Sequence, residues 1–181
     1  MSGKLTLISS ATASGSSSVE FTSGLTDYDE IIFYFVNVQH SHDDRFIEWQ
    51  VSTATSSYNE TITSTFFLAQ QHYSWSTEAT LYYDASRDLA QSTLRQKIHS
   101  SADNGGTVTG ASASGEMHLF GCGSSSKVKH FYSRLNNIFY IEGTYDTHVA
   151  GYINQTDPIT KIKFQPDGNT FSGEFYMYGV S

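Results

Sequence analysis

The stretch Glu30-Ile31-Ile32-Phe33-Tyr34-Phe35-Val36-Asn37-Val38 carries the strongest strand signal in the chain. β-branched and aromatic residues dominate it, which favours a strand over a buried helix. Successive side chains of a strand point to opposite faces, and here both faces are apolar. Ile31, Phe33 and Phe35 share one face, and Ile32, Tyr34, Val36 and Val38 share the other. We therefore predict a central strand that is covered on both sides.

Shorter alternating segments lie on either side of this strand. Residues 46–51, 115–120, 127–135, 148–154 and 171–180 each alternate apolar and polar side chains or bear β-forming residues. At the start of the chain, residues 5–8 and 19–21 predict two short strands, and the Ser-rich residues 9–18 predict a flexible bend between them. Near the end, Pro166-Asp167-Gly168-Asn169 predicts a hairpin turn.

The pattern predicts an all-β protein, an antiparallel two-sheet β-sandwich of the jelly-roll type with about 8–10 strands. The chain has 181 residues, 12 Tyr, 12 Phe, 14 Gly and only 2 Pro, which suits many short turns between strands. A single domain spanning residues 1–181 is expected at this length.

Charge and hydropathy exclude several classes of partner. The formal net charge is −8, so the chain is expected to repel nucleic acid. No run of 18 apolar residues predicts a membrane span, and the first residues do not resemble a signal peptide. Cys122 is the only cysteine, which rules out a disulfide within the chain. Alternating Lys127 and Lys129, like Lys161 and Lys163, predict solvated strand faces.

Three groups of residues are candidates for a chemical site. His40, His42, Asp43 and Asp44 could offer metal ligands, but a solvated polar turn is the preferred interpretation. Glu48, Glu116 and Glu174 could supply a carboxylate pair for sugar hydrolysis, yet nothing in the sequence ties two of them together. Cys122 lies between glycines and is interpreted as a neutral thiol. We therefore predict no catalytic residue, no metal, no cofactor and no enzymatic activity.

An aromatic cluster is the remaining candidate site. Tyr73, Trp75, Tyr82 and Tyr83 fall in a long connection, predicted as irregular, that covers residues 69–87. Exposed aromatic side chains can bind ligands, although packing on the core or in a subunit interface is the preferred alternative. These four residues are the predicted ligand-binding residues.

The sequence also resembles a family of small, mostly uncharacterised virion-associated proteins of tailed bacteriophages, especially marine phages. The features that carry the resemblance are spread along the whole chain. They are residues 7–14 (LISSATAS), 19–24 (VEFTSG), 28–30 (YDE), 65–67 (TFF), 88–93 (DLAQST), 118–120 (HLF), 128–131 (VKHF), 150–152 (AGY), 162–164 (IKF), 172–173 (SG) and 177–180 (MYGV).

The resemblance implies a virion structural protein: a tail, tail-fibre or head-decoration component. Such a protein is made in the host cytoplasm without a signal peptide, is located in the virion, and contacts other virion proteins, here as a homo-oligomer. The alternative is a receptor- or glycan-binding adhesin module whose partner is a host-surface glycan. A polysaccharide-cleaving enzyme is the third hypothesis and has the least support.

Overall fold

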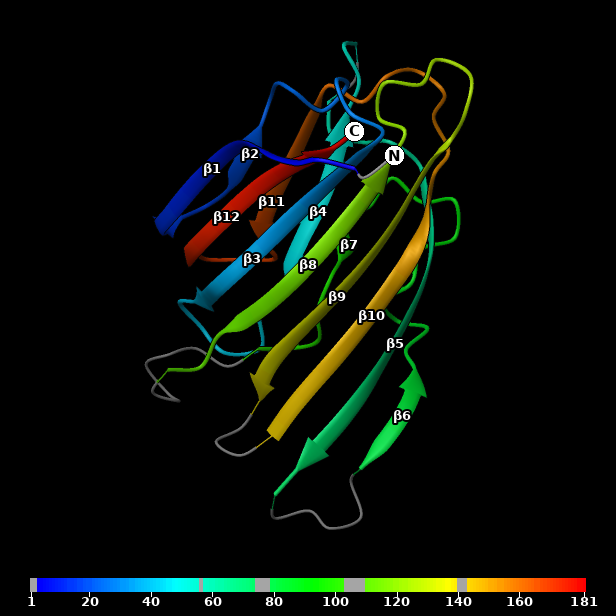
Figure 1. Ribbon diagram of the computed structural model, residues 1–181. Helices are drawn as coiled ribbons and strands as arrows, with labels where there is room; N and C mark the ends of the chain where they lie inside the picture. Colours follow the sequence, from blue (N-terminus) through cyan, green and yellow to red (C-terminus); the bar gives the residue numbers. More distant parts are fainter. Residues whose placement is uncertain (1–2, 56, 74–78, 103–109, 140–142) are drawn as a thin grey trace.

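The computed structural model describes residues 3–55, 57–73, 79–102, 110–139 and 143–181, and within them it contains two antiparallel β-sheets and no helix (Figure 1). The large sheet has the strand order β1 (Leu5–Ser16), β12 (Phe171–Val180), β3 (Glu30–His40), β8 (Ala113–Phe120), β9 (Lys129–Phe139), β10 (Gly143–Ile153), β5 (Ile62–His72) and β6 (Thr80–Tyr83). The small sheet has the order β2 (Val19–Phe21), β11 (Lys161–Pro166), β4 (Ile47–Ser52) and β7 (Gln96–Lys97). The predicted all-β sandwich is confirmed.

The strand pairing is that of a jelly roll with two insertions. β1 pairs with β12, β2 with β11, β3 with β8, and β4 with β7, so that the pairs are nested from the ends of the chain inward. These eight strands form two four-stranded halves, which is the jelly-roll arrangement of two Greek keys. Two further strand pairs, β5 with β6 and β9 with β10, are inserted and extend only the large sheet beyond β8. They raise the number of strands above the predicted range.

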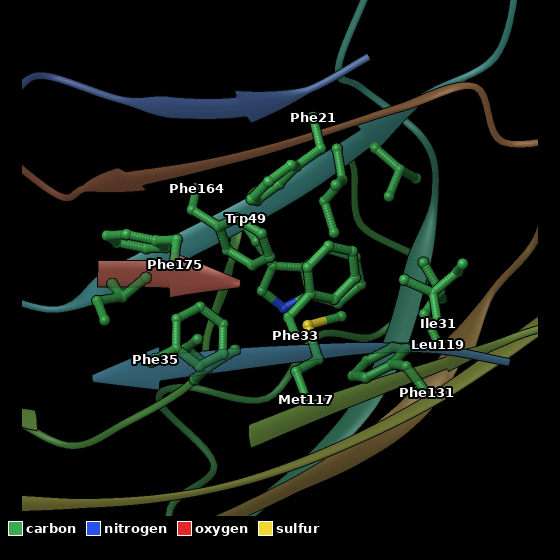
Figure 2. Close-up of a cluster of buried hydrophobic side chains, with 14 of the residues drawn as sticks. Phe21, Ile31, Phe33, Phe35, Trp49, Met117, Leu119, Phe131, Phe164 and Phe175 are labelled. Carbon is green, nitrogen blue, oxygen red and sulfur yellow. The ribbon is translucent and has the colours of Figure 1, made fainter. Parts of the chain in front are cut away.

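The hydrophobic core lies between the two sheets. Trp49 of β4 is fully buried, and its ring meets the ring of Phe131 edge-on with centroids 4.8 Å apart. Phe33 and Phe35 of β3 pack against Phe164 of β11, at 5.2 and 5.1 Å between centroids (Figure 2). The inward alternation predicted for the strands of both sheets is therefore what builds the core.

The segment from Asp84 to Ala102 covers the part of the large sheet that the small sheet leaves open. Its Ser100 N–H donates to Thr147 Oγ1 of β10 at 3.1 Å, and its Ser101 carbonyl accepts from the Asn137 amide of β9 at 2.9 Å, where Thr147 and Asn137 are both buried. The Ser64 hydroxyl of β5 donates to Gln96 Oε1 at 2.5 Å. The inner face of the large sheet is thus covered from β1 to β5, whereas its outer face carries no second layer among the described residues (Figure 1).

Two details of β3 differ from the prediction. The outer face of this strand is not covered by a layer, although neighbouring side chains still bury Ile32. Asn37 has a positive φ of 51°, and the register with β8 shifts between Phe35 and Val38. This bulge turns Val38 into the core, whereas strict alternation assigned Val38 to the opposite face.

Two predictions about connections are wrong. The Ser-rich residues predicted as a flexible bend lie mostly inside β1, which pairs with β12 along its length because small β-compatible side chains suit an edge strand. The segment Pro166–Asn169 is a turn, but β11 and β12 belong to different sheets, so it is not a hairpin turn. The left-handed residue of this turn is Asn169, with φ 61°.

Candidate binding groove on the large sheet

The outer face of the large sheet is built by alternate residues of neighbouring strands. The register aligns Tyr34, Glu116, Arg134 and His148 in one row across β3, β8, β9 and β10. The adjacent row aligns Ser114, Asn136 and Asp146. Residues distant in sequence therefore meet on one exposed surface, which is rich in planar polar and aromatic side chains.

A shallow hollow of about 590 Å³ lies between these two rows. We call it the outer-face groove; Tyr34, Phe35, Ser114, Gly115, Glu116, Arg134, Asn136 and Asp146 line it. Gly115 forms part of its floor with φ +157°, and a Cβ there would lie 2.2 Å from the Arg134 carbonyl oxygen. The Asn37 N–H at the β3 bulge donates to Ser114 Oγ at 2.9 Å. The hollow thus depends on a bulge in β3 and a missing side chain in β8.

Arg134 and Asp146 form a two-pronged ion pair in the groove. Arg134 Nε donates to Asp146 Oδ1 at 3.0 Å, and Nη2 donates to Oδ2 at 2.9 Å. His148 Nε2 lies 3.4 Å from the same Oδ2. The hydrogen bonds from Arg134 hold the pKa of the Asp146 carboxyl below its usual range. Asp146 is therefore ionised at neutral pH, and the guanidinium is held in one orientation.

Aromatic–imidazole stacks flank the groove on both sides. The His118 ring stacks on the Tyr132 ring with centroids 4.4 Å apart and 13° between planes. Phe67 stacks on His148 at 5.0 Å and 3°. His118 Nδ1 lies 2.5 Å from Glu30 Oε1, and its Nε2 lies 3.6 Å from Glu116 Oε1. These contacts fix the side chains beside the groove.

The groove presents polar groups of fixed orientation beside a tyrosine ring. Asn136 donates its side-chain amide to Thr144 Oγ1 at 2.6 Å and to the Tyr145 carbonyl at 2.8 Å, so its orientation is set. Burial raises the pKa of the Tyr34 hydroxyl, which is therefore a neutral donor at ordinary pH. Fixed hydrogen-bonding groups beside a tyrosine ring are suited to a polar ligand with one apolar face. The lining carries two carboxylates and one guanidinium, an excess of negative charge.

Two of the four aromatic residues predicted to bind ligand, Tyr82 and Tyr83, do not face the same surface. Tyr82 and Tyr83 are neighbours in β6, so they point to opposite faces of the sheet. Tyr83 pairs with Phe67 in the register and shares the outer face with it. Tyr73 follows β5 and is 82% exposed, and Trp75 lies outside the described residues. Their role in ligand binding stays a prediction, and the connection predicted as irregular contains β6 and the end of β5.

The His40 cluster is separated by the fold. His40 is buried at the end of β3, whereas His42 and Asp44 are exposed in the turn, so the predicted solvated turn is wrong for His40 and correct for these two residues. His40 Nε2 lies 3.4 Å from Nε2 of the buried His99. Among the described residues, no three His, Cys, Asp or Glu side chains are arranged to hold a metal ion.

The three candidate carboxylates are divided between the two sheets. Glu116 and Glu174 lie on the large sheet, and the Glu174 carboxylate accepts a hydrogen bond from the Tyr176 hydroxyl. Glu48 lies on the small sheet, 3.9 Å from Arg95, so it does not face either of them. Cys122 is buried, and burial raises the pKa of its thiol to about 12. That thiol is neutral at physiological pH.

The prediction that Lys129 lies on a solvated strand face is wrong. Its side chain is fully buried, with a relative exposure of 0%. The ammonium Nζ donates to the carbonyls of Ser124, Lys127 and Thr156 at 2.7, 3.1 and 2.7 Å. Lys161 is exposed, and Lys163 pairs with Glu20 at 2.6 Å, as expected for the solvated face of β11.

Sequence reasoning identified only part of the groove. Alternation assigned Glu116 to an outward face and Tyr34 to the face opposite Phe33 and Phe35, a face expected to be covered. Arg134, Asn136 and Asp146 were not singled out. Their meeting depends on the pairing of β8, β9 and β10, and local sequence does not specify strand partners. The alternation of Tyr132, Arg134 and Asn136 with buried residues was the signal available in β9.

Comparison with known proteins gives no further assignment. No family model, no curated protein and no solved structure matches the chain. No helix in the described part of the chain has the length and apolar character needed to cross a membrane.

Proposed function

We propose that the chain is a virion structural protein of a tailed bacteriophage, a tail, tail-fibre or head-decoration component that acts through protein–protein contacts. The observation that carries the proposal is the uncovered outer face of the large sheet. Tyr132 on this face is 42% exposed, and Leu5, Leu7, Phe67 and Leu81 are also exposed. Aromatic and apolar side chains of this kind are enriched in protein interfaces. The resemblance to phage proteins and the jelly roll, which occurs in viral capsids, support the same reading.

Mass spectrometry of gradient-purified particles of the encoding phage tests this proposal. We expect the chain to copurify with the particle proteins, and Tyr132→Lys on the outer face to lower its incorporation. Ser125→Lys in an exposed loop is the matched control and should be incorporated normally. Absence of the native chain from purified particles would overturn the proposal.

The outer-face groove favours a second function, the binding of a host-surface glycan. A sugar ring has an apolar face for the Tyr34 ring and hydroxyls for the fixed groups of Arg134, Asn136 and Asp146. Because the lining carries excess negative charge, a neutral saccharide fits better than a uronic or sialic acid. This function is compatible with the first if the chain lies at the surface of the particle.

A glycan array followed by calorimetry on the best neutral glycan tests the groove. Arg134→Ala should weaken binding about tenfold, because hydrogen bonds from a charged donor are lost. Lys161→Ala, on the exposed face of the small sheet, should leave binding unchanged. Loss of binding in Trp75→Ala, with Arg134→Ala unaffected, would assign the ligand to the predicted aromatic cluster instead. Failure of the native protein to bind any glycan would remove this second function.

A further inference from the structure

The ends of the two sheets are protected very unequally. A free edge strand offers unpaired backbone N–H and C=O groups, and proteins commonly limit this risk by keeping edge strands short. Three of the four edge strands follow this rule: β6 has 4 residues, β2 has 3 and β7 has 2. The fourth, β1, has 12 residues. It is at the end of the large sheet (Figure 1).

The backbone of β1 is open along most of its outer side. Apart from the ladder with β12, the hydrogen bonds of β1 to described residues involve only the ends of the strand. Near its C-terminal end, the Ser14 N–H donates to Ser16 Oγ and the Gly15 N–H donates to Ser172 Oγ. Just before the strand, the Lys4 N–H donates to the Ser181 carbonyl. Every second backbone group between Leu5 and Ala13 therefore faces away from β12 without a partner in the described chain.

The side chains of β1 lack the usual features that prevent edge pairing. The sequence LTLISSATASGS contains no Lys, Arg, Asp, Glu or Pro, although the whole chain carries a formal charge of −8. Bulges interrupt the register at Ile8 and near Gly15, and the stretch Ser9–Ala13 between them is regular. Its side chains are small, so another strand can approach closely. Leu5 and Leu7 are 48% and 51% exposed and would gain apolar contacts from such a neighbour.

We propose that β1 pairs antiparallel with β1 of a second copy of this chain, joining two large sheets into one continuous sheet. Antiparallel pairing of a strand with its own copy is self-complementary about a two-fold axis, so one surface serves both partners. The strand itself is uncharged, so two copies can pair along it without placing like charges directly opposite each other. The proposal deepens the homo-oligomer expected for a virion component by naming the contact, and it does not require the particle itself.

Analytical ultracentrifugation of the purified chain tests the pairing. The native protein should sediment as a dimer at high concentration. Ser10→Lys places a like charge near the two-fold axis in each copy and should weaken the dimer about tenfold. Ser10 and Thr65 are both exposed on the outer face of the large sheet, so Thr65→Lys in β5 is the matched control and should not change the dimer. Mixing Ser10→Lys with Ser10→Glu chains should restore dimers, which excludes misfolding as the cause of the loss.

Amide hydrogen exchange locates the contact. Exchange within Leu5–Ala13 should slow when the protein concentration is raised and should be fast in Ser10→Lys. A native chain that is monomeric at the highest concentration measured would overturn the proposal. A dimer that protects other amides and tolerates Ser10→Lys would overturn it as well. Either result leaves the particle experiment unaffected, so the two proposals fail separately.

Discussion

Lys129 acts as an internal cation that ties a loop to the sandwich. The ammonium group lies among three backbone carbonyls, from Ser124, Lys127 and Thr156, and these replace the water it loses on burial. Burial lowers the pKa of Lys129, and electrostatic interactions with Cys122, Asp157 and Glu60 raise it. Two segments that are distant in sequence, the β8–β9 connection and the β10–β11 connection, are thereby held together.

Lys129→Met should destabilise the protein by about 3 kcal/mol, because three backbone carbonyls lose a charged donor. Urea unfolding measures the change. Lys127→Met is the matched control: its side chain is exposed in the same loop, so its effect should stay within about 0.5 kcal/mol. Equal stabilities of the two variants would show that the buried ammonium contributes nothing net.

The buried pair His40 and His99 links the end of β3 to the segment that follows β7. His99 Nε2 accepts the Ile47 N–H at 2.8 Å, and its Nδ1–H donates to the Ser100 carbonyl, which defines a neutral ring. Burial lowers the pKa of His40 to about 3 and that of His99 to about 4. The positive charge of Arg45 also lowers the pKa of His40, and that of Arg87 also lowers the pKa of His99.

Acid should therefore destabilise the fold well before the carboxylates titrate. Histidines of the unfolded chain gain protons below about pH 6.5, whereas the folded pair stays neutral, so stability present above pH 6.5 is lost as pH falls towards 4. Each histidine contributes a slope of about 1.4 kcal/mol per pH unit in this range. Urea unfolding at pH 7, 6 and 5 measures it. His40→Phe should reduce the slope, and exposed His42→Gln should not; an unchanged slope in His40→Phe would contradict the assignment.

At the scale of one element, β8 has to pass close to β9 at Gly115. Gly115→Ala would place a Cβ 2.2 Å from the Arg134 carbonyl oxygen and 2.7 Å from Leu135 Cα, and both atoms are backbone. We expect a loss of at least about 2 kcal/mol and a disturbed groove. Gly110→Ala is the control for backbone strain without a steric clash. Gly110 has φ +81°, but an added Cβ would have no atom within 4 Å. Thermal unfolding of both variants should show a larger loss of stability for Gly115→Ala. Equal losses would mean that the close approach of β8 to β9 does not cause the loss.

Alternation predicted most strands because it records which side of a sheet is buried. It succeeded for β4 and β11, where Ile47, Trp49, Ile162 and Phe164 all lie in the core. It failed at Val38, since a bulge adds one residue and reverses the faces. It also failed for residues 9–16 of β1, because an edge strand that faces solvent needs no apolar period and its sequence resembles that of a loop.

The groove was harder to predict than the strands, because its residues come together only through the order and register of the paired strands. Tyr34 and Asp146 are 112 residues apart in sequence and are brought to one hollow only by the order β3-β8-β9-β10. Pairing partners depend on the whole arrangement rather than on local preference. Lys129 was misassigned for the same reason, since the carbonyls that satisfy it come from two connections.

At the scale of the molecule, the insertions share the core of the jelly roll. Ile62, Phe66 and Leu68 of β5 belong to the same buried cluster as Trp49 and Phe164 of the small sheet. The extension made of β9, β10, β5 and β6 therefore has no separate core of its own among the described residues. The single domain of residues 1–181 stays a prediction, and the shared core of the described residues is the reason to keep it.

A single domain should unfold in one cooperative transition. In a Trp75→Phe background, Trp49 is the remaining tryptophan and reports on the contact with Phe131, while far-UV circular dichroism reports on both sheets. Phe66→Ala in β5 should lower stability by about 3–5 kcal/mol and move both signals together, because a cavity in one cooperative core is felt throughout. Exposed Thr65→Ala is the neighbouring control and should move neither by more than about 0.5 kcal/mol. If Phe66→Ala shifted the dichroism but not the Trp49 signal, the extension would unfold on its own, and the chain would comprise two units rather than one.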